Sequence, residues 1–104
     1  MLLKRGMKSN AVKCLQYGLR IMCINPGTID GIFGRDTYNA VIKFQKRFGL
    51  NPDGIVGDGT WNKLKNQITP IQSALRSHNH KIAVDGIAGH DTYNAVVTFQ
   101  KNRG

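Results

Sequence analysis

A segment of 17 residues that occurs twice constrains the fold of this chain more than any other feature. Residues 30–46 read DGIFGRDTYNAVIKFQK, and residues 85–101 read DGIAGHDTYNAVVTFQK. A shorter copy, DGIVGDGTWNKL, occupies residues 53–64. Internal repeats of this kind indicate that one structural unit recurs and that neighbouring copies pack against one another.

Each copy has the composition of a tight loop that leads into a helix. Asp30 and Gly31 form a turn dipeptide, because Asp can accept hydrogen bonds from the nearby backbone and Gly tolerates positive φ. Asp36 then falls in the first helical turn, where a negative charge favours the exposed N–H groups. We expect Ile32 or Phe33 to fold back beneath the loop as an apolar plug.

Apolar residues at spacings of three and four predict helices, and no segment has the alternation of a sheet. The predicted helices span residues 9–23, 35–48, 58–67, 70–79 and 90–102. A break is expected at Thr69-Pro70, since Pro is tolerated in the first turn of a helix but not in its interior. The second of these helices has one apolar stripe, formed by Ala40, Val41, Phe44 and Phe48. The sequence therefore predicts an all-α fold.

Composition and charge exclude several kinds of site. The chain has 15 Lys and Arg against 6 acids, a formal net charge of +9, so an anionic partner is expected. All six acids are aspartates within the repeat motifs, and there is no glutamate. Because no nucleophile–base pairing has sequence support either, no catalytic site is predicted. The histidines lack Cys or Glu at metal-site spacing, so no metal or other cofactor is expected at His78, His80 or His90.

The two cysteines predict a chain made in a reducing compartment. Cys14 and Cys23 are nine residues apart in one expected helix. That spacing places them on opposite faces and about 13 Å apart along the axis. A disulfide between them would require the helix to break, so two free thiols are the better interpretation. Residues 1–6 contain no apolar run of signal-peptide length, and no segment predicts a membrane span. We expect synthesis in the cytoplasm without a signal peptide, and no membrane contact.

Three ordered motifs resemble those of a known family. They read GMKSNAVKCLQYGL at 6–19, DGIFGRDTYNAVIKFQ at 30–45 and GLNPDGIVGDGTWNKL at 49–64. Together they resemble the peptidoglycan-binding domain of bacterial and phage lytic enzymes. The resemblance implies a three-helix bundle at residues 1–66, followed by a truncated second repeat at residues 67–104 that packs on it. It also implies a non-catalytic module that targets an endolysin-type or autolysin-type hydrolase to the wall, with the catalytic domain outside this sequence.

Aromatic, amide and basic side chains near the motifs are the candidate ligand-binding residues. They are Arg35, Tyr38, Gln45, Trp61, Tyr93 and Gln100. Tyr38 and Gln45 are seven residues apart and share a helix ridge, which Tyr93 and Gln100 repeat. One interpretation is a groove wall that stacks on sugar or hydrogen-bonds a stem peptide. The other is structural, with Tyr and Trp packing at the edge of the core and Gln capping a loop carbonyl.

Peptidoglycan, or an anionic polymer attached to it, is the expected partner, and the bacterial cell wall is the expected place of action. Basic helices joined by short turns also permit a nucleic-acid-binding module. The repeated motifs explain those turns without a recognition helix, so nucleic acid is the weaker alternative. A structural role, for instance in a phage particle, is the third.

Overall fold

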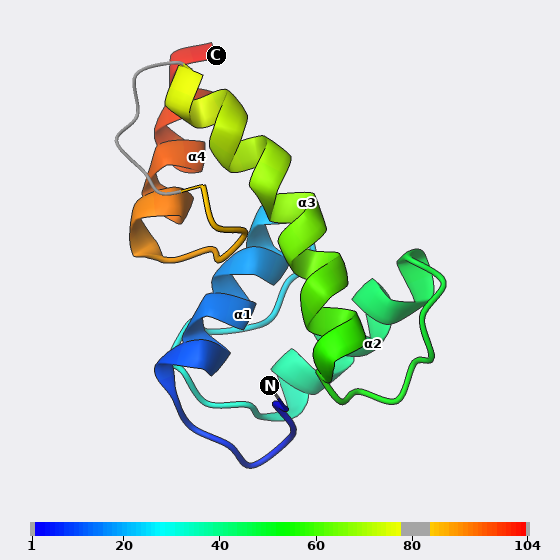
Figure 1. Cartoon of the computed structure of the whole chain (residues 1–104). Coiled ribbons are helices and arrows are strands. Elements are labelled where there is room, and N and C mark those ends of the chain that lie inside the picture. The colour runs from blue at the N-terminus through cyan, green and yellow to red at the C-terminus, as the bar shows by residue number, and fades with distance from the viewer. Residues whose placement is uncertain (1, 78–83, 104) are drawn as a thin grey trace.

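The computed structural model describes residues 2–77 and 84–103, with side chains described as far as residue 98. Its helices are α1 (Asn10–Ile21), α2 (Arg35–Arg47), α3 (Asp58–Ser77) and α4 (His90–Arg103). Figure 1 shows α3 as the longest element, with α2 near its first half and α4 beside its second half. Within the described ranges there is no strand, only isolated antiparallel bridges between Leu3 and Val56 and between Lys8 and Ile32. The predicted all-α fold is confirmed.

The sequence predicts a helix break at Thr69-Pro70, but the structure has a continuous helix there. Residues 58–67 and the described part of 70–79 form the single helix α3, which continues through Pro70. The buried residues of α3 keep one phase on both sides of the proline, and among them are Trp61, Leu64, Ile68, Gln72 and Leu75. Pro70 itself is exposed. Burial along this stripe therefore outweighs the roughly 3 kcal/mol that a proline costs inside a helix.

Both α1 and α2 end in a Schellman motif, but a different residue takes the left-handed position. Gly49 follows α2 with φ 71°, and Cys23 follows α1 with φ 63°. The N–H of Ile24 donates to the carbonyl of Leu19 at 2.9 Å, and the equivalent bond from Leu50 is 2.8 Å. These bonds satisfy carbonyls that the last helical turn leaves without partners.

The two thiols are free, as predicted, but their surroundings differ. Cys14 is half-buried in α1. Burial, and then the charge of Asp85, raises the pKa of its thiol above the ordinary value. Cys23 is exposed and lies beyond the end of α1. The prediction that one helix holds both cysteines is therefore wrong, because α1 ends before Cys23.

We expect Cys23→Gly to raise the free energy of unfolding by about 1 kcal/mol. A non-glycine residue in the left-handed region costs about 1–2 kcal/mol, and the extra freedom of glycine in the unfolded chain offsets part of that gain. Urea denaturation measures the change. Gly49→Ala is the matched control. No atom lies within 4 Å of a Cβ at that position, so only the positive φ disfavours alanine there. We expect this variant to lose about 1 kcal/mol of stability. Lower stability in Cys23→Gly would contradict this explanation.

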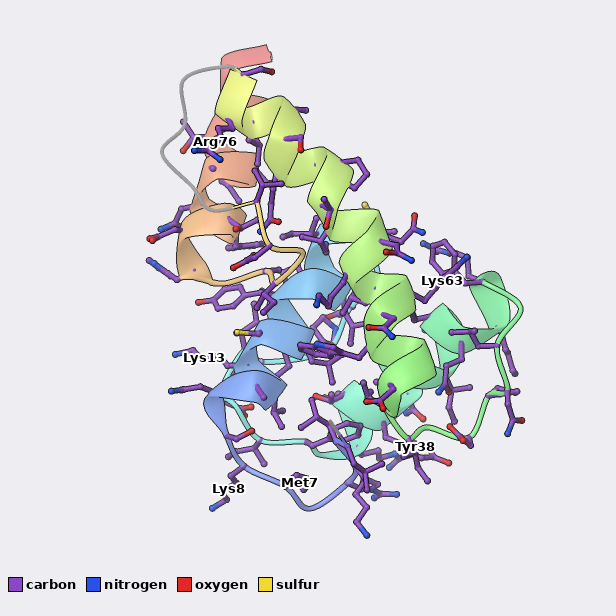
Figure 2. All side chains as sticks on the ribbon, viewed as in Figure 1. Met7, Lys8, Lys13, Tyr38, Lys63 and Arg76 are labelled. Atoms are coloured by element: carbon purple, nitrogen blue, oxygen red, sulfur yellow. The ribbon has the colours of Figure 1, made fainter. Side chains whose placement is uncertain are left out.

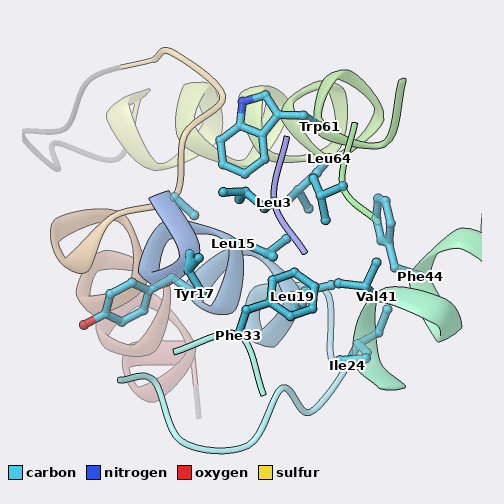
Figure 3. Close-up of a cluster of buried hydrophobic side chains, with 14 of the residues drawn as sticks. Leu3, Leu15, Tyr17, Leu19, Ile24, Phe33, Val41, Phe44, Trp61 and Leu64 are labelled. Carbon is cyan, nitrogen blue, oxygen red and sulfur yellow. The ribbon is translucent and has the colours of Figure 1, made fainter. Parts of the chain in front are cut away.

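The core lies between α1, α2 and the first half of α3, as Figure 3 shows. Of the two plug candidates, Phe33 is buried at 1% exposed, whereas Ile32 is 43% exposed. Ala40, Val41 and Phe44 are buried as predicted, and Phe48 packs at the edge of the core. In the described parts of the chain, no helix combines the length and apolarity needed to cross a bilayer.

Candidate functional site

One buried glutamine holds each of the three repeat loops. Gln16 from α1 holds the loop at 30–32, Gln45 from α2 holds 53–55, and Gln72 from α3 holds 85–87. The exposed fractions of these three side chains are 0%, 1% and 0%. A buried amide is stable only when its donors and acceptor are paired, and here the loop backbone supplies the partners.

The first loop shows the full set of contacts. The amide nitrogen of Gln16 lies 3.2 Å from Oδ1 of Asp30, 3.0 Å from the carbonyl oxygen of Ile32 and 3.0 Å from the hydroxyl of Thr37. Its oxygen accepts from the backbone N–H groups of Asp30 and Gly31, at 3.0 and 2.9 Å. Loop and helix start are therefore tied to one side chain of the preceding helix.

Hydrogen bonds also favour the ionised form of the turn aspartates. Oδ1 of Asp30 accepts from the backbone N–H of Ile32 at 2.9 Å, and this bond, followed by the one from Gln16, lowers the pKa of Asp30 below its ordinary value. Asp53 has the same arrangement, with the N–H of Ile55 as the main cause of its lowered pKa. Both carboxylates therefore carry a negative charge at neutral pH.

The same geometry leaves one isoleucine of each loop in solvent. Ile32, Ile55 and Ile87 are 43%, 39% and 38% exposed, while the residue that follows each of them is buried. An exposed aliphatic side chain on a loop held in this way is available for contact with a ligand.

A cavity of about 340 Å³ lies beside the first loop and the start of α2. Ile32 and Pro26 contribute apolar wall, and Asp30, Arg35 and Asp36 contribute charges of both signs. Arg35 and Asp36 are exposed. Among the described residues, neither side chain forms an ion pair. Their charged groups are thus open to an incoming ligand.

The structure places Arg35 at this cavity but corrects the placement of Gln45. That side chain is not on an accessible ridge: it is 1% exposed, and it caps the carbonyl of Ile55 at 3.0 Å. This is the structural alternative described above for the glutamines. Trp61 is also in the core, at 9% exposed, so neither side chain presents a surface to a wall polymer.

Tyr38 and Tyr93 are half-buried, and each ring is in contact with a neighbouring residue. Tyr38 lies against Gly54, where a Cβ would overlap the ring, and the guanidinium carbon of Arg5 is 5.4 Å from the ring centroid. Figure 2 shows Tyr38 at the end of the molecule near Met7. The ring of Tyr93 is 5.3 Å from that of Tyr17, which joins α4 to α1. The backbone of Gln100 lies in α4, and its side chain lies outside the described part.

Of the predicted residues whose side chains are described, Arg35 lies at the cavity, whereas Gln45 and Trp61 are buried. Gln16 and Gln72, which hold the other two loops, were not among the predicted residues. Gln16 and Gln72 recur at a spacing of 56 residues, each within the apolar stripe of its helix. A polar residue that repeats at a core position is the signal that could have identified them.

Comparisons with known proteins identify the family. The family model for the peptidoglycan binding domain matches residues 8–64. A spore cortex-lytic enzyme of Bacillus cereus is 40% identical over 58 residues, covering 56% of this chain and 22% of that enzyme. A zinc D-Ala-D-Ala carboxypeptidase of Streptomyces albus G is 43% identical over 67 residues, covering 60% of this chain and 25% of that enzyme. The chain thus spans about a quarter of each.

A solved structure supports the same assignment. The N-terminal domain of SleB matches with a TM-score of 0.63 at 36% sequence identity, covering 64% of this chain and 92% of that domain. The sequence match and the fold thus agree on one family. This chain belongs to the peptidoglycan-binding domain family.

Proposed function

We propose that this chain is a non-catalytic module that binds peptidoglycan and holds a hydrolase at the bacterial cell wall. The observation that carries the proposal is the family match over residues 8–64. That range contains α1, α2, the start of α3, two of the glutamine-held loops and the cavity beside α2. The part of the chain that defines the family is thus also the part that contains the candidate site.

The relatives support a catalytic partner. The match covers 22% of the spore cortex-lytic enzyme and 25% of the zinc carboxypeptidase, so most of each enzyme lies outside the shared domain. We infer that the catalytic groups of such an assembly belong to a separate, linked or associated domain. Binding energy alone is then what this chain contributes, by raising the local concentration of the hydrolase on its substrate.

Two repeat units are part of the proposal, at residues 1–66 and 67–104. In support, Gln72 holds the loop of the second unit through the same atoms that Gln16 uses in the first. α3 serves both units, because its two halves contribute to one continuous buried stripe. Packing of Tyr93 on Tyr17 gives the second unit a further contact with the first.

Anionic polymers of the wall are proposed as an auxiliary contact. The net charge is +9, and the segment before α1 carries three exposed basic residues, Lys4, Arg5 and Lys8. Attraction between exposed charges is screened beyond about 8 Å at physiological ionic strength, so this contribution should be sensitive to salt.

Sedimentation with purified peptidoglycan tests the proposed function. We expect the chain to sediment with walls from which teichoic acid has been removed. On walls that retain teichoic acid, binding should be weaker at 1 M salt (Debye length about 3 Å) than at 0.1 M. Cellulose is the control for non-specific sedimentation, and heparin and DNA are the competing polyanions. Binding to heparin or DNA without sedimentation on stripped walls would reject the proposal in favour of a general polyanion-binding module.

A further inference from the structure

We propose that the cavity beside α2 recognises the peptide of peptidoglycan, through a segment that carries both a free carboxylate and a free amine, and not the glycan. This inference rests on the proposed function and names the part of the polymer that is bound. It depends on three features of the described residues: the charges of the cavity, the covering of the aromatic rings and the exposed isoleucine.

The cavity carries charges of both signs at its wall. The guanidinium of Arg35 suits a carboxylate, because its fork of donors can form two parallel hydrogen bonds. The carboxylate of Asp36 is exposed and suits an ammonium group, and Asp30 adds a second negative charge. Stem peptides offer both partners, a carboxylate at the free end and an amine on the diamino acid. N-acetylated sugars offer no ammonium group, so the glycan would leave these carboxylates unpaired.

Within the described residues, no aromatic ring offers a fully exposed face to a sugar. Binding to the flat face of a sugar ring requires an exposed aromatic face, and none of the described aromatic side chains is exposed. The half-buried rings already have neighbours. Tyr38 has Arg5 over its ring, Tyr93 packs on Tyr17, and Phe48 lies 4.7 Å from Phe44 between ring centroids.

The apolar contact at the cavity is aliphatic. Ile32 lines the cavity, and its side chain is 43% exposed. The loop is held in place there, because the backbone carbonyl of Ile32 accepts a hydrogen bond from buried Gln16 at 3.0 Å. An aliphatic side chain suits the methyl and methylene groups of short amino acids such as alanine. Because the loop is already held in place, binding does not have to order it, which favours recognition of a small peptide.

Isothermal titration of the full chain with two probes tests this inference. One probe is a synthetic stem tripeptide with a free diamino-acid amine and a free C-terminal carboxylate. The other is glycan freed of peptide by an amidase. We expect the tripeptide to bind and the glycan neither to bind nor to compete. Arg35→Gln and Asp36→Asn should each weaken tripeptide binding about tenfold or more, the usual effect of losing a hydrogen bond between charged groups.

Arg76→Gln is the matched control, because it also removes one exposed positive charge. Figure 2 shows Arg76 at the opposite end of the molecule from Tyr38, which belongs to the helix that begins with Arg35. The control should bind within twofold of the unmodified chain, and circular dichroism should be the same for all variants. Binding of peptide-free glycan in place of the tripeptide would overturn the inference.

Tripeptide binding that survives both cavity substitutions would also overturn it, since the site would then lie elsewhere. In either case sedimentation on intact peptidoglycan would persist, so the proposed function would stand. Loss of sedimentation on intact peptidoglycan by the unmodified chain would instead reject the proposed function itself.

Discussion

Replacing Gln45 with alanine is expected to lower the free energy of unfolding by about 3 kcal/mol or more. The substitution removes the acceptor of the Gly54 N–H at 2.9 Å and the donor to the Thr60 hydroxyl at 3.1 Å, both of them buried contacts. It also leaves the carbonyl of Ile55 without its partner. Each buried polar group left unpaired costs about 1–3 kcal/mol, and two or three are affected here.

Urea denaturation measures this loss, with Asn39→Ala as the control on the same helix. Asn39 is exposed, so its replacement should change stability by less than about 0.5 kcal/mol. Gln45→Glu keeps the shape but replaces the donor amide with a group that repels Asp53, whose Oδ1 is 3.0 Å away. It should destabilise the chain as well. A loss below about 1 kcal/mol in Gln45→Ala would show that the loop does not depend on this side chain.

Phe44→Ala is expected to cost about 3–5 kcal/mol, the usual range for removing a buried Phe side chain. Phe44 is 1% exposed in the centre of the core, and its ring centroid is 4.7 Å from that of Phe48. Thermal and urea unfolding both measure the change. Phe48→Ala is the comparison, because its half-buried ring should lose less. Equal and small losses for the two residues would contradict the assignment of Phe44 to the core.

Much of the fold was predictable, because helix propensity and apolar spacing agree in most segments. The helix at 35–48 differs from α2 (Arg35–Arg47) by a single residue, since a loop glycine precedes it and Gly49 follows it. The predicted break at Pro70 was wrong because the local preference of a proline against a helix interior is outweighed by the packing of the buried stripe of α3. Ile68 and Gln72 lie on either side of the proline, and both are fully buried in α3.

The candidate site was less predictable, for two physical reasons. A glutamine in a helix is usually at the surface, so the sequence left two interpretations of Gln45 open, ligand binding and the capping of a loop carbonyl. Its hydrogen bonds to the loop at 53–55 support the second. The cavity depends on how the turn that contains Asp30 folds back against the start of α2, where Arg35 and Asp36 lie. Sequence spacing identifies these residues individually, but it does not show that they face one space.

The most direct test of the central claim is a nuclear magnetic resonance titration of the ¹⁵N-labelled chain with soluble fragments of digested peptidoglycan. If this chain binds peptidoglycan at the cavity beside α2, the backbone amide signals of residues 27–37 should shift in a saturable manner, and those of α4 should not. An absence of saturable shifts would contradict peptidoglycan binding. Shifts confined to α4 and the second half of α3 would contradict the location of the site.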